Sequence, residues 1–167
     1  MKEVLFYILI NSLFWIIIHF LSGFIVHLIP SKFYKPQRWL FKKRWWEFDG
    51  KLYTKLFLVK KWKDKVPEAG ELFKINPFSK KNLKSLEKSY LKRFLLETCR
   101  AELSHLLPIL FFPLCIPWNP GIAKWIMLAY ALFANFPFII IQRYNRIRLE
   151  KILKYNKLVL HNSSFLP

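Results

Sequence analysis

Two long stretches of the chain are apolar, and nearly all of the charge lies between them and after the second. Residues 4–30 contain no acidic residue, lysine or arginine, and residues 103–141 contain only Lys124. A helix of about 20 apolar residues crosses the hydrocarbon layer of a bilayer. The first stretch therefore predicts one membrane-spanning helix, and the second stretch is long enough for two.

Proline and turn residues divide the second stretch. Residues 103–118 are few and contain three prolines, so this part could kink, or enter the membrane without crossing it cleanly. The tetrapeptide WNPG at 118–121 predicts a turn, and residues 122–141 have the length of a full span. We expect an all-α membrane protein with about three transmembrane helices, at 4–30, 103–118 and 122–141, of which the last two could form a re-entrant pair.

The composition supports this interpretation. The chain has 167 residues, of which 54% are hydrophobic, and yet its formal net charge is +18. Because charged and apolar residues are separated into blocks, we expect one integral membrane domain over 1–167, with a basic segment at 31–102 and a basic tail at 142–167. Nucleic-acid binding is the alternative for a basic chain, but no helix-turn-helix, zinc or RNA-binding signature is present.

The charge distribution predicts the orientation in the membrane. Residues 31–100 carry 20 lysines and arginines, the tail after residue 141 carries six, and the turn at 118–121 carries none. The positive-inside rule then places 31–100 and the C-terminus in the cytoplasm and Met1 outside the cell membrane. A cleaved signal peptide is disfavoured because the first apolar stretch is long and lacks a small-x-small cleavage site.

The basic segment interleaves aromatic rings with cations over residues 33–67, a mixture that suits the headgroup layer of a membrane. Ser79 is a plausible N-cap for an amphipathic helix over 81–105, which we expect to lie along the membrane and to turn into it near Ala101. Loops are expected before this helix, at Pro67, Gly70 and Pro77.

The sequence also allows expectations for four single residues. Asn11 and His19 should face protein rather than lipid, because unsatisfied polar groups in hydrocarbon are costly. Cys99 and Cys115 have no CxxC spacing, and we expect no disulfide bond between them.

The densest group of ionisable residues is the motif ETCRAELSH at 97–105. Glu102 and His105 are three residues apart, which makes them neighbours on one face of a helix. A carboxylate beside an imidazole can fix the tautomer of the ring and favour its action as a general base on a hydroxyl. Glu97 and Arg100 share the same spacing. The alternative is a set of structural ion pairs where the helix enters lipid, although a purely structural pair at this depth would be costly.

A second group lies at the end of the last span, in ANFPFIIIQRYNRIRLEK at 134–151. Asn135 and Gln142 are seven residues apart and so face the same side of a helix, and Arg143, Asn145 and Arg146 follow. Cations at a helix C-terminus are favoured by the helix dipole, which accounts for part of the charge. Amides together with arginines can also hold a phosphate, a carbonyl or a sugar hydroxyl. We interpret this end as a polar pocket for lipid-linked substrates.

A third group is KKWKDKVP at 60–67. Lys61, Trp62 and Lys63 are candidate substrate-binding residues, because the lysines could bind the phosphates of a donor while Asp64 pairs locally. A plain interfacial basic patch is the alternative. No metal site is expected, since the histidines lack ligand spacing and no acidic cluster is present.

These three motifs, in this order and after an N-terminal span that ends in IPSK, resemble the glycosyl-4,4'-diaponeurosporenoate acyltransferases. Those are small bacterial membrane proteins of the staphyloxanthin-type carotenoid pathway, and the resemblance covers about residues 4–150. It implies that a fatty acyl chain is transferred to a glucose hydroxyl of a C30 carotenoid glycoside. Ile147 stands where the family motif QRYNRPR has proline, and isoleucine lets the helix continue.

The resemblance implies acyl transfer, and the roles of the candidate residues in it are our own hypothesis. His105 would act as the general base, Glu102 would orient it, and Glu97 with Arg100 would shape the site. Gln142, Arg143, Asn145 and Arg146 would bind the polar head of donor or acceptor or stabilise an oxyanion. The further substrate-binding candidates are Asn135, Lys61, Trp62 and Lys63. No cofactor is expected beyond an acyl donor such as acyl-CoA or a phospholipid, and the partners are membrane lipids and the lipid-linked glycoside.

Two other functions stay open from the residues alone. One is a non-catalytic lipid-binding subunit of a larger membrane complex. The other is a different lipid-modifying enzyme such as a headgroup methyltransferase, although no glycine-rich nucleotide motif is present.

Overall fold

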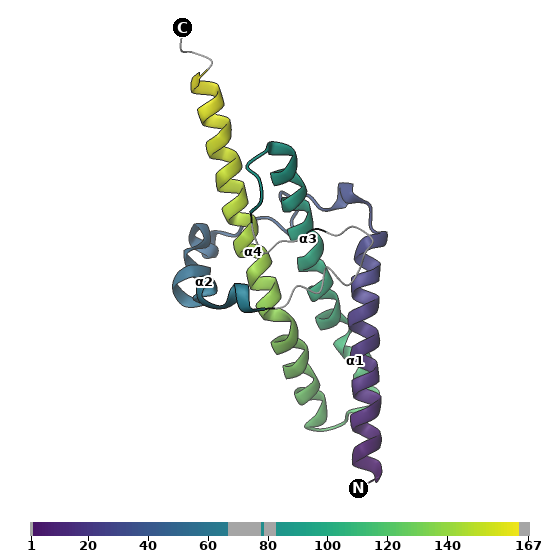
Figure 1. Cartoon of the computed structure of the whole chain (residues 1–167). Helices are drawn as coiled ribbons and strands as arrows, with labels where there is room; N and C mark the ends of the chain where they lie inside the picture. Colours follow the sequence, from purple (N-terminus) through teal and green to yellow (C-terminus); the bar gives the residue numbers. More distant parts are fainter. Residues whose placement is uncertain (1, 67–77, 79–82, 164–167) are drawn as a thin grey trace. The chain divides into compact units, whose positions relative to one another are not determined.

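The computed structural model describes residues 2–66, 78 and 83–163, with side chains up to residue 156. Every regular element in these residues is helical. The three long helices are α1 (Lys2–Leu28), α3 (Lys88–Phe111) and α4 (Ala123–Ser163) (Figure 1). Three stretches are long and apolar enough to cross a membrane, namely Lys2–Leu28, Lys88–Trp118 and Ala123–Asn156. The expected all-α fold with three candidate spans is therefore confirmed.

Short helices connect the long ones. Between α1 and α3 they are η1 (Ser31–Phe33), η2 (Trp45–Gly50), η3 (Leu52–Leu56), α2 (Val59–Trp62) and η4 (Lys63–Lys65); between α3 and α4 there is η6 (Phe112–Trp118). The predicted turn follows η6, and Gly121 adopts a φ of +59° there, a conformation that glycine reaches without a steric penalty.

By its internal contacts the chain forms two compact units. The first unit comprises Met1–Pro30 and Ala101–Ile139, and the second comprises Ser31–Arg100 and Ile140–Pro167. α3 and α4 each contribute residues to both. The single integral membrane domain expected from the sequence stays a prediction.

The first unit has an aromatic core and a polar contact. Trp15 and Ile18 of α1 pack with Cys115 and Ala131, while most other apolar side chains of α1 are exposed, as a lipid-facing helix requires. His19 is half-buried, with its ring beside those of Trp15 and Tyr130.

Asn11 and Asn119 form a reciprocal amide pair in the same unit. Asn11 Nδ2 donates to Asn119 Oδ1 at 2.9 Å, and Asn119 Nδ2 donates to Asn11 Oδ1 at 2.8 Å. Trp118 Nε1 donates to the same Asn11 oxygen at 3.1 Å. Asn11 therefore faces protein, as expected, because its polar atoms are satisfied by neighbouring side chains.

The second unit is held by two hydrophobic clusters. One joins Tyr53 and Val59 to Ile140, Tyr144 and Ile147 of α4. The other joins Leu91, Phe94 and Leu95 of α3 to Leu149 of α4. The clusters fix the basic segment and the start of α3 against the polar end of α4.

The aromatic residues of the basic segment fall into two sets. Tyr34 and Phe41 are 2% and 1% exposed, whereas Trp39 and Trp45 are 75% and 85% exposed. The segment is thus a folded part of the second unit, and only its exposed rings fit the headgroup layer that the sequence suggested for all of them.

Helix boundaries differ from those expected. α3 begins at Lys88 rather than at residue 81, because Ser85 Oγ accepts the amide of Glu87 and offers the backbone a non-helical conformation just before the first turn. α3 is continuous through Ala101, and its expected entry into the membrane near that residue stays a prediction.

Beyond the expected end at residue 141, α4 continues through Ile147, as the absence of proline there predicted. The expected loops and N-cap at Pro67, Gly70, Pro77 and Ser79 lie outside the described residues.

Candidate functional site

His105 lies on α3 in the first unit and is held by Asn135 of α4. The His105 Nδ1 atom is 3.1 Å from Asn135 Oδ1. Asn135 Nδ2 donates to the carbonyl of Ala131 at 2.9 Å, and this bond fixes which end of the amide is oxygen. Nδ1 must then carry the ring proton and donate it to Asn135, which leaves Nε2 as the basic nitrogen. The contact selects the tautomer that a general base needs.

A stacked ring holds the imidazole from its face. The rings of His105 and Phe138 are 4.4 Å apart between centroids and 10° from parallel. Phe138 follows Asn135 by three residues, so one face of α4 supplies both contacts. His105 is half-buried and Asn135 is fully buried. Both of these contacts come from side chains that carry no charge.

Glu102 lies one turn before His105 on α3 and is 1% exposed. The spacing expected from the sequence is present, because α3 is helical over both residues. The Nδ1 atom donates its hydrogen bond to Asn135, a residue that the sequence assigned to the substrate. Orientation of His105 by Glu102 stays a prediction.

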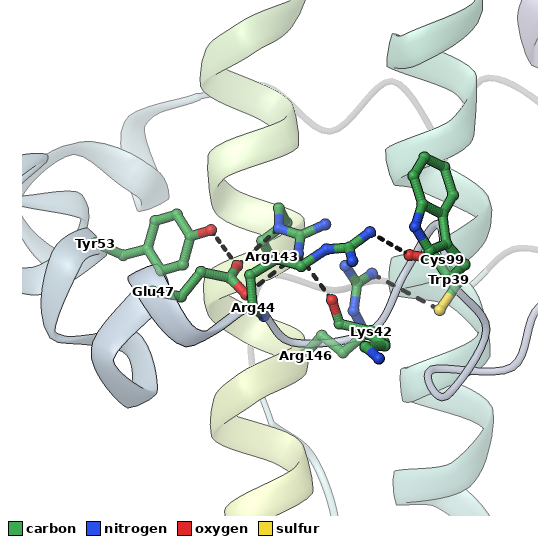
Figure 2. A network of polar contacts seen from close by, with 8 residues as sticks. All are labelled: Trp39, Lys42, Arg44, Glu47, Tyr53, Cys99, Arg143 and Arg146. Carbon is green, nitrogen blue, oxygen red and sulfur yellow. Dashed lines mark hydrogen bonds and ion pairs between the residues drawn. The ribbon is translucent and has the colours of Figure 1, made fainter.

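Glu47 is the centre of a polar network in the second unit, shown in Figure 2. Its carboxylate receives Arg143 Nε at 2.8 Å on Oε1 and Arg143 Nη2 at 3.2 Å on Oε2. Tyr53 donates its hydroxyl to Oε1, and the backbone amide of Arg44 donates to Oε2. Arg143 Nη2 also lies 3.1 Å from the carbonyl of Lys42. The side chain of Glu47 is fully buried, so these bonds satisfy a charge withdrawn from solvent.

The network sets the ionisation of its members. Burial alone would raise the pKa of Glu47, but the hydrogen bonds from Arg143, the Arg44 amide and Tyr53 outweigh it, and the pKa lies below 4.5. Burial, and then the Glu47 carboxylate, raise the pKa of Tyr53. The phenol therefore stays protonated and donates, while Glu47 stays ionised and accepts.

Arg100 and Glu97 form an ion pair, as in the structural alternative considered for this motif, and their assignment to the substrate stays a prediction. Arg100 Nη1 donates to Glu97 Oε1 at 2.5 Å, and Nη2 lies 3.5 Å from Ser31 Oγ. The guanidinium also lies 5.1 Å from the centre of the Tyr34 ring, a cation–π contact. Burial raises the pKa of Tyr34 to about 12, although Arg100 acts in the opposite direction. Among the described residues, Arg100 Nε is buried without a hydrogen-bond partner.

The other polar residues of α4 are also largely enclosed. Arg146 is 2% exposed, with Nη1 3.7 Å from Cys99 Sγ and its guanidinium 5.7 Å from the Phe41 ring. Gln142 is 6% exposed, and its Oε1 atom has no hydrogen-bond partner within the described part of the chain. Asn145 is half-buried. A buried acceptor without a donor is a position that a substrate hydroxyl could satisfy.

The candidate residues of the third motif, KKWKDKVP, lie in different environments in the structure. Trp62 packs against the cluster around Tyr53 and donates Nε1 to the carbonyl of Phe57 at 2.8 Å, and its assignment to a substrate stays a prediction. Lys63 pairs with Asp64, which confirms the local pair expected from the sequence. Lys61 is exposed.

The described residues include both cysteines and most of the side chains of the types that bind metal ions. Cys99 and Cys115 are both buried, and neither takes part in a disulfide bond. In residues 2–66, 78 and 83–156, no group of three His, Cys, Asp or Glu side chains could hold a metal ion.

Sequence reasoning missed three contributors to these sites. It assigned no role to Phe138, Glu47 or Tyr53. Glu47 did carry a signal, because it is one of only three acidic residues between residues 31 and 66 and lies among aromatic and basic neighbours. Its partner Arg143 is 96 residues away, a separation that no periodicity reveals.

Comparison with known proteins identifies the family. The family model described as glycosyl-4,4'-diaponeurosporenoate acyltransferase matches residues 36–155. Relatives with this name from *Staphylococcus aureus* strains bovine RF122 / ET3-1, MRSA252 and USA300 are each 36% identical over 132 residues, which is 77% of this chain and 77% of the relative. No solved structure is significantly similar to the chain. On this evidence the chain belongs to the glycosyl-4,4'-diaponeurosporenoate acyltransferase family and is an acyltransferase.

Proposed function

We propose that this chain esterifies a sugar hydroxyl of a carotenoid glycoside, a glycosyl-4,4'-diaponeurosporenoate, with a fatty acyl chain, and that His105 is the general base. Family membership carries the reaction class. The observation that supports the base is the Nδ1 contact of His105 with Asn135 at 3.1 Å, because it leaves Nε2 as the basic nitrogen.

In the proposed reaction, His105 carries one proton from the sugar hydroxyl to the leaving group. Nε2 takes the proton of the sugar hydroxyl as its oxygen attacks the carbonyl carbon of the acyl donor, and a new C–O bond forms. The bond from that carbon to the leaving group then breaks, and the leaving group departs with the proton from Nε2. No covalent acyl-enzyme intermediate is needed.

The second unit is proposed to bind polar parts of the substrates. Gln142 Oε1 and Arg100 Nε are buried atoms without a partner in the described residues, and they offer an acceptor and a donor to hydroxyl or carbonyl groups. Asn145 and Arg146 are proposed to assist. Arg143 supports the site indirectly, since Glu47 and the Lys42 carbonyl already bind its guanidinium.

The membrane orientation expected from the charge pattern is part of the proposal. We place Met1 outside the cell membrane and residues 31–100 and the C-terminus in the cytoplasm, because these segments carry 26 of the 28 lysines and arginines. The acyl donor, a thioester or a phospholipid, and the surrounding lipids are its proposed partners.

Acyl transfer by the purified protein tests the function. The protein alone, in phospholipid nanodiscs, is mixed with a glycosylated carotenoid acid and a labelled acyl donor, and the product is identified by mass spectrometry. A labelled ester that depends on His105 is expected. A protein that makes no ester alone, but does so on addition of another subunit, would instead be a non-catalytic component.

His19→Ala is the matched control for His105→Ala. His19 is also a half-buried histidine of the first unit, and its ring packs on Tyr130 rather than on an amide. The control variant should retain turnover. Normal turnover by His105→Ala would remove His105 from the mechanism while leaving the family assignment in place.

A further inference from the structure

A cationic cleft lies in the second unit, between the short helices of the basic segment and α4. Its volume is about 620 Å³, within the range of small-molecule sites. Two acidic residues, Asp49 and Asp64, and the hydroxyl-bearing Thr54 and Tyr144 contribute to its lining. Five cations line it, and these are Lys51, Lys60, Lys63, Arg148 and Lys151.

The acidic residues of the cleft are occupied by their own partners. Asp64 pairs with Lys63, and Asp49 pairs with Lys43, which lies outside the lining. The latter pair lowers the pKa of Asp49, which therefore stays ionised. Within the described residues, no carboxylate pairs with the exposed Lys51, Lys60 or Arg148. Asp49 also interacts electrostatically with Lys51. The five cations and two carboxylates of the lining nevertheless leave the cleft with a net charge of +3, which favours an anionic ligand.

An apolar hollow adjoins this cleft. It has a volume of about 540 Å³, shares Asp49 and Lys51 with the cleft, and is otherwise lined by Phe48, Leu52, Lys55 and Leu56. Phe48 and Leu56 are 58% and 68% exposed. A cationic cleft beside exposed apolar side chains suits a ligand that has both an anionic head and an acyl chain.

The backbone that separates the two hollows adopts an unusual conformation. Phe48, Asp49 and Gly50 have φ values of +45°, +54° and +87°. This conformation is costly for the first two residues and persists only where the surrounding structure holds it. At Gly50, an added Cβ would lie 3.4 Å from Ile147 Cγ2, so the turn packs closely on α4. The cleft wall is therefore built by a strained turn fixed against a helix.

From this arrangement we infer that the cleft binds the phosphate-bearing head of the acyl donor. The inference rests on the proposed function, in which a donor supplies the acyl group. The acceptor proposed above is a glycosyl ester and has no ionised group, whereas coenzyme A thioesters and anionic phospholipids both carry phosphate. Lysine and arginine side chains bind phosphate by charge-assisted hydrogen bonds.

Two triple variants with the same change in charge test the cleft. The cleft variant is Lys51→Gln/Lys60→Gln/Arg148→Gln. The control variant is Lys32→Gln/Lys35→Gln/Lys92→Gln, which removes three exposed cations of the same unit that do not line the cleft. Because all six residues are exposed, both variants should fold, and thermal melting checks this.

Binding is measured separately from turnover. The probes are a non-hydrolysable thioether analogue of a fatty acyl-CoA, with the protein in phosphatidylcholine nanodiscs, and phosphatidylglycerol titrated into those nanodiscs. Loss of three phosphate contacts, each expected to weaken binding about fivefold, should weaken binding of the true donor head by about 100-fold in the cleft variant. The control variant should change by less than about threefold, and binding should weaken with added salt.

The two probes distinguish the source of the phosphate. Selective loss of the acyl-CoA analogue supports a thioester donor, and selective loss of phosphatidylglycerol supports a phospholipid donor. Equal effects of both triple variants, or no effect of either, would overturn the inference. If the unmodified protein transfers acyl groups, the cleft variant should also show a raised KM for the donor and an unchanged KM for the glycoside.

Failure of the inference and failure of the proposed function give different results. If the parent transfers acyl groups and the cleft variant binds and transfers normally, only the cleft assignment is wrong. If the parent binds the probe through the cleft but transfers nothing from either donor, the proposed function is wrong and the donor assignment falls with it.

Discussion

The polar centre of the first unit and that of the second unit satisfy buried groups in different ways. His105 is held by the amide of Asn135 and the ring of Phe138, neither of which carries a charge. Glu47 is held by the guanidinium of Arg143 together with neutral donors. A bidentate ion pair holds both of its members as ions, whereas the contacts of His105 with Asn135 and Phe138 bring no charge to the ring. The comparison separates a histidine contacted by neutral side chains from a buried ion pair, and we expect substitutions at His105 to act mainly on activity and those at Glu47 mainly on stability.

The largest expected effect is on activity in the first unit. His105→Ala should lower kcat by about 10²- to 10⁴-fold, the usual contribution of a general base. The melting temperature of the protein should change little, because the half-buried ring is not part of the hydrophobic core. Steady-state kinetics and thermal melting of the same preparation check both. A large fall in melting temperature with proportionate loss of activity would mean that His105 is structural.

In the second unit, a loss of stability is expected instead. Glu47→Leu should destabilise the protein by about 3–5 kcal/mol, because it leaves the guanidinium of Arg143 without its buried carboxylate. Denaturant titration in detergent measures this change. The double variant Glu47→Leu/Arg143→Leu should recover part of the lost stability. If both single and double variants are as stable as the parent, the network does not hold the second unit together.

Asn135 offers a sharper test of the first centre. Asn135→Leu removes the acceptor oxygen and should lower kcat about 10- to 100-fold with little change in KM, because the ring loses its fixed tautomer and not its contact with substrate. Asn135→Asp keeps an oxygen in place and should restore much of kcat. Equal activities of the two variants would show that the acceptor at this position is irrelevant.

The smallest expected effect is a pH dependence of stability in the second unit. The pKa of Glu47 is lowered in the folded protein, so its contribution is present above 4.5 and is lost as the pH falls through the lowered value. The melting temperature should therefore fall on acidification below about pH 4.5. Glu47→Gln should reduce this slope, whereas Glu3→Gln, at an exposed carboxylate of α1, should not.

Some parts of this structure were predictable from the sequence, and the reasons are physical. Block separation of apolar residues predicted three long helices, and the spacing of Glu97 and Arg100 predicted that they share one helix face, since both depend on neighbours in sequence. The division of the aromatic residues into buried Phe41 and exposed Trp45 was not predictable, because short irregular helices impose no period. The contact of His105 with Asn135 depends on how two helices align across 30 residues.

Each unit contains one of the two cysteines, Cys115 in the first and Cys99 in the second, and both are completely buried. A thiol of this kind reacts with an alkylating reagent only while its surroundings are transiently open. The alkylation rate of each sulfur therefore reports how often its surroundings open. Comparing the rates for Cys115 and Cys99 would show which unit opens more readily when substrate, salt or acid is added.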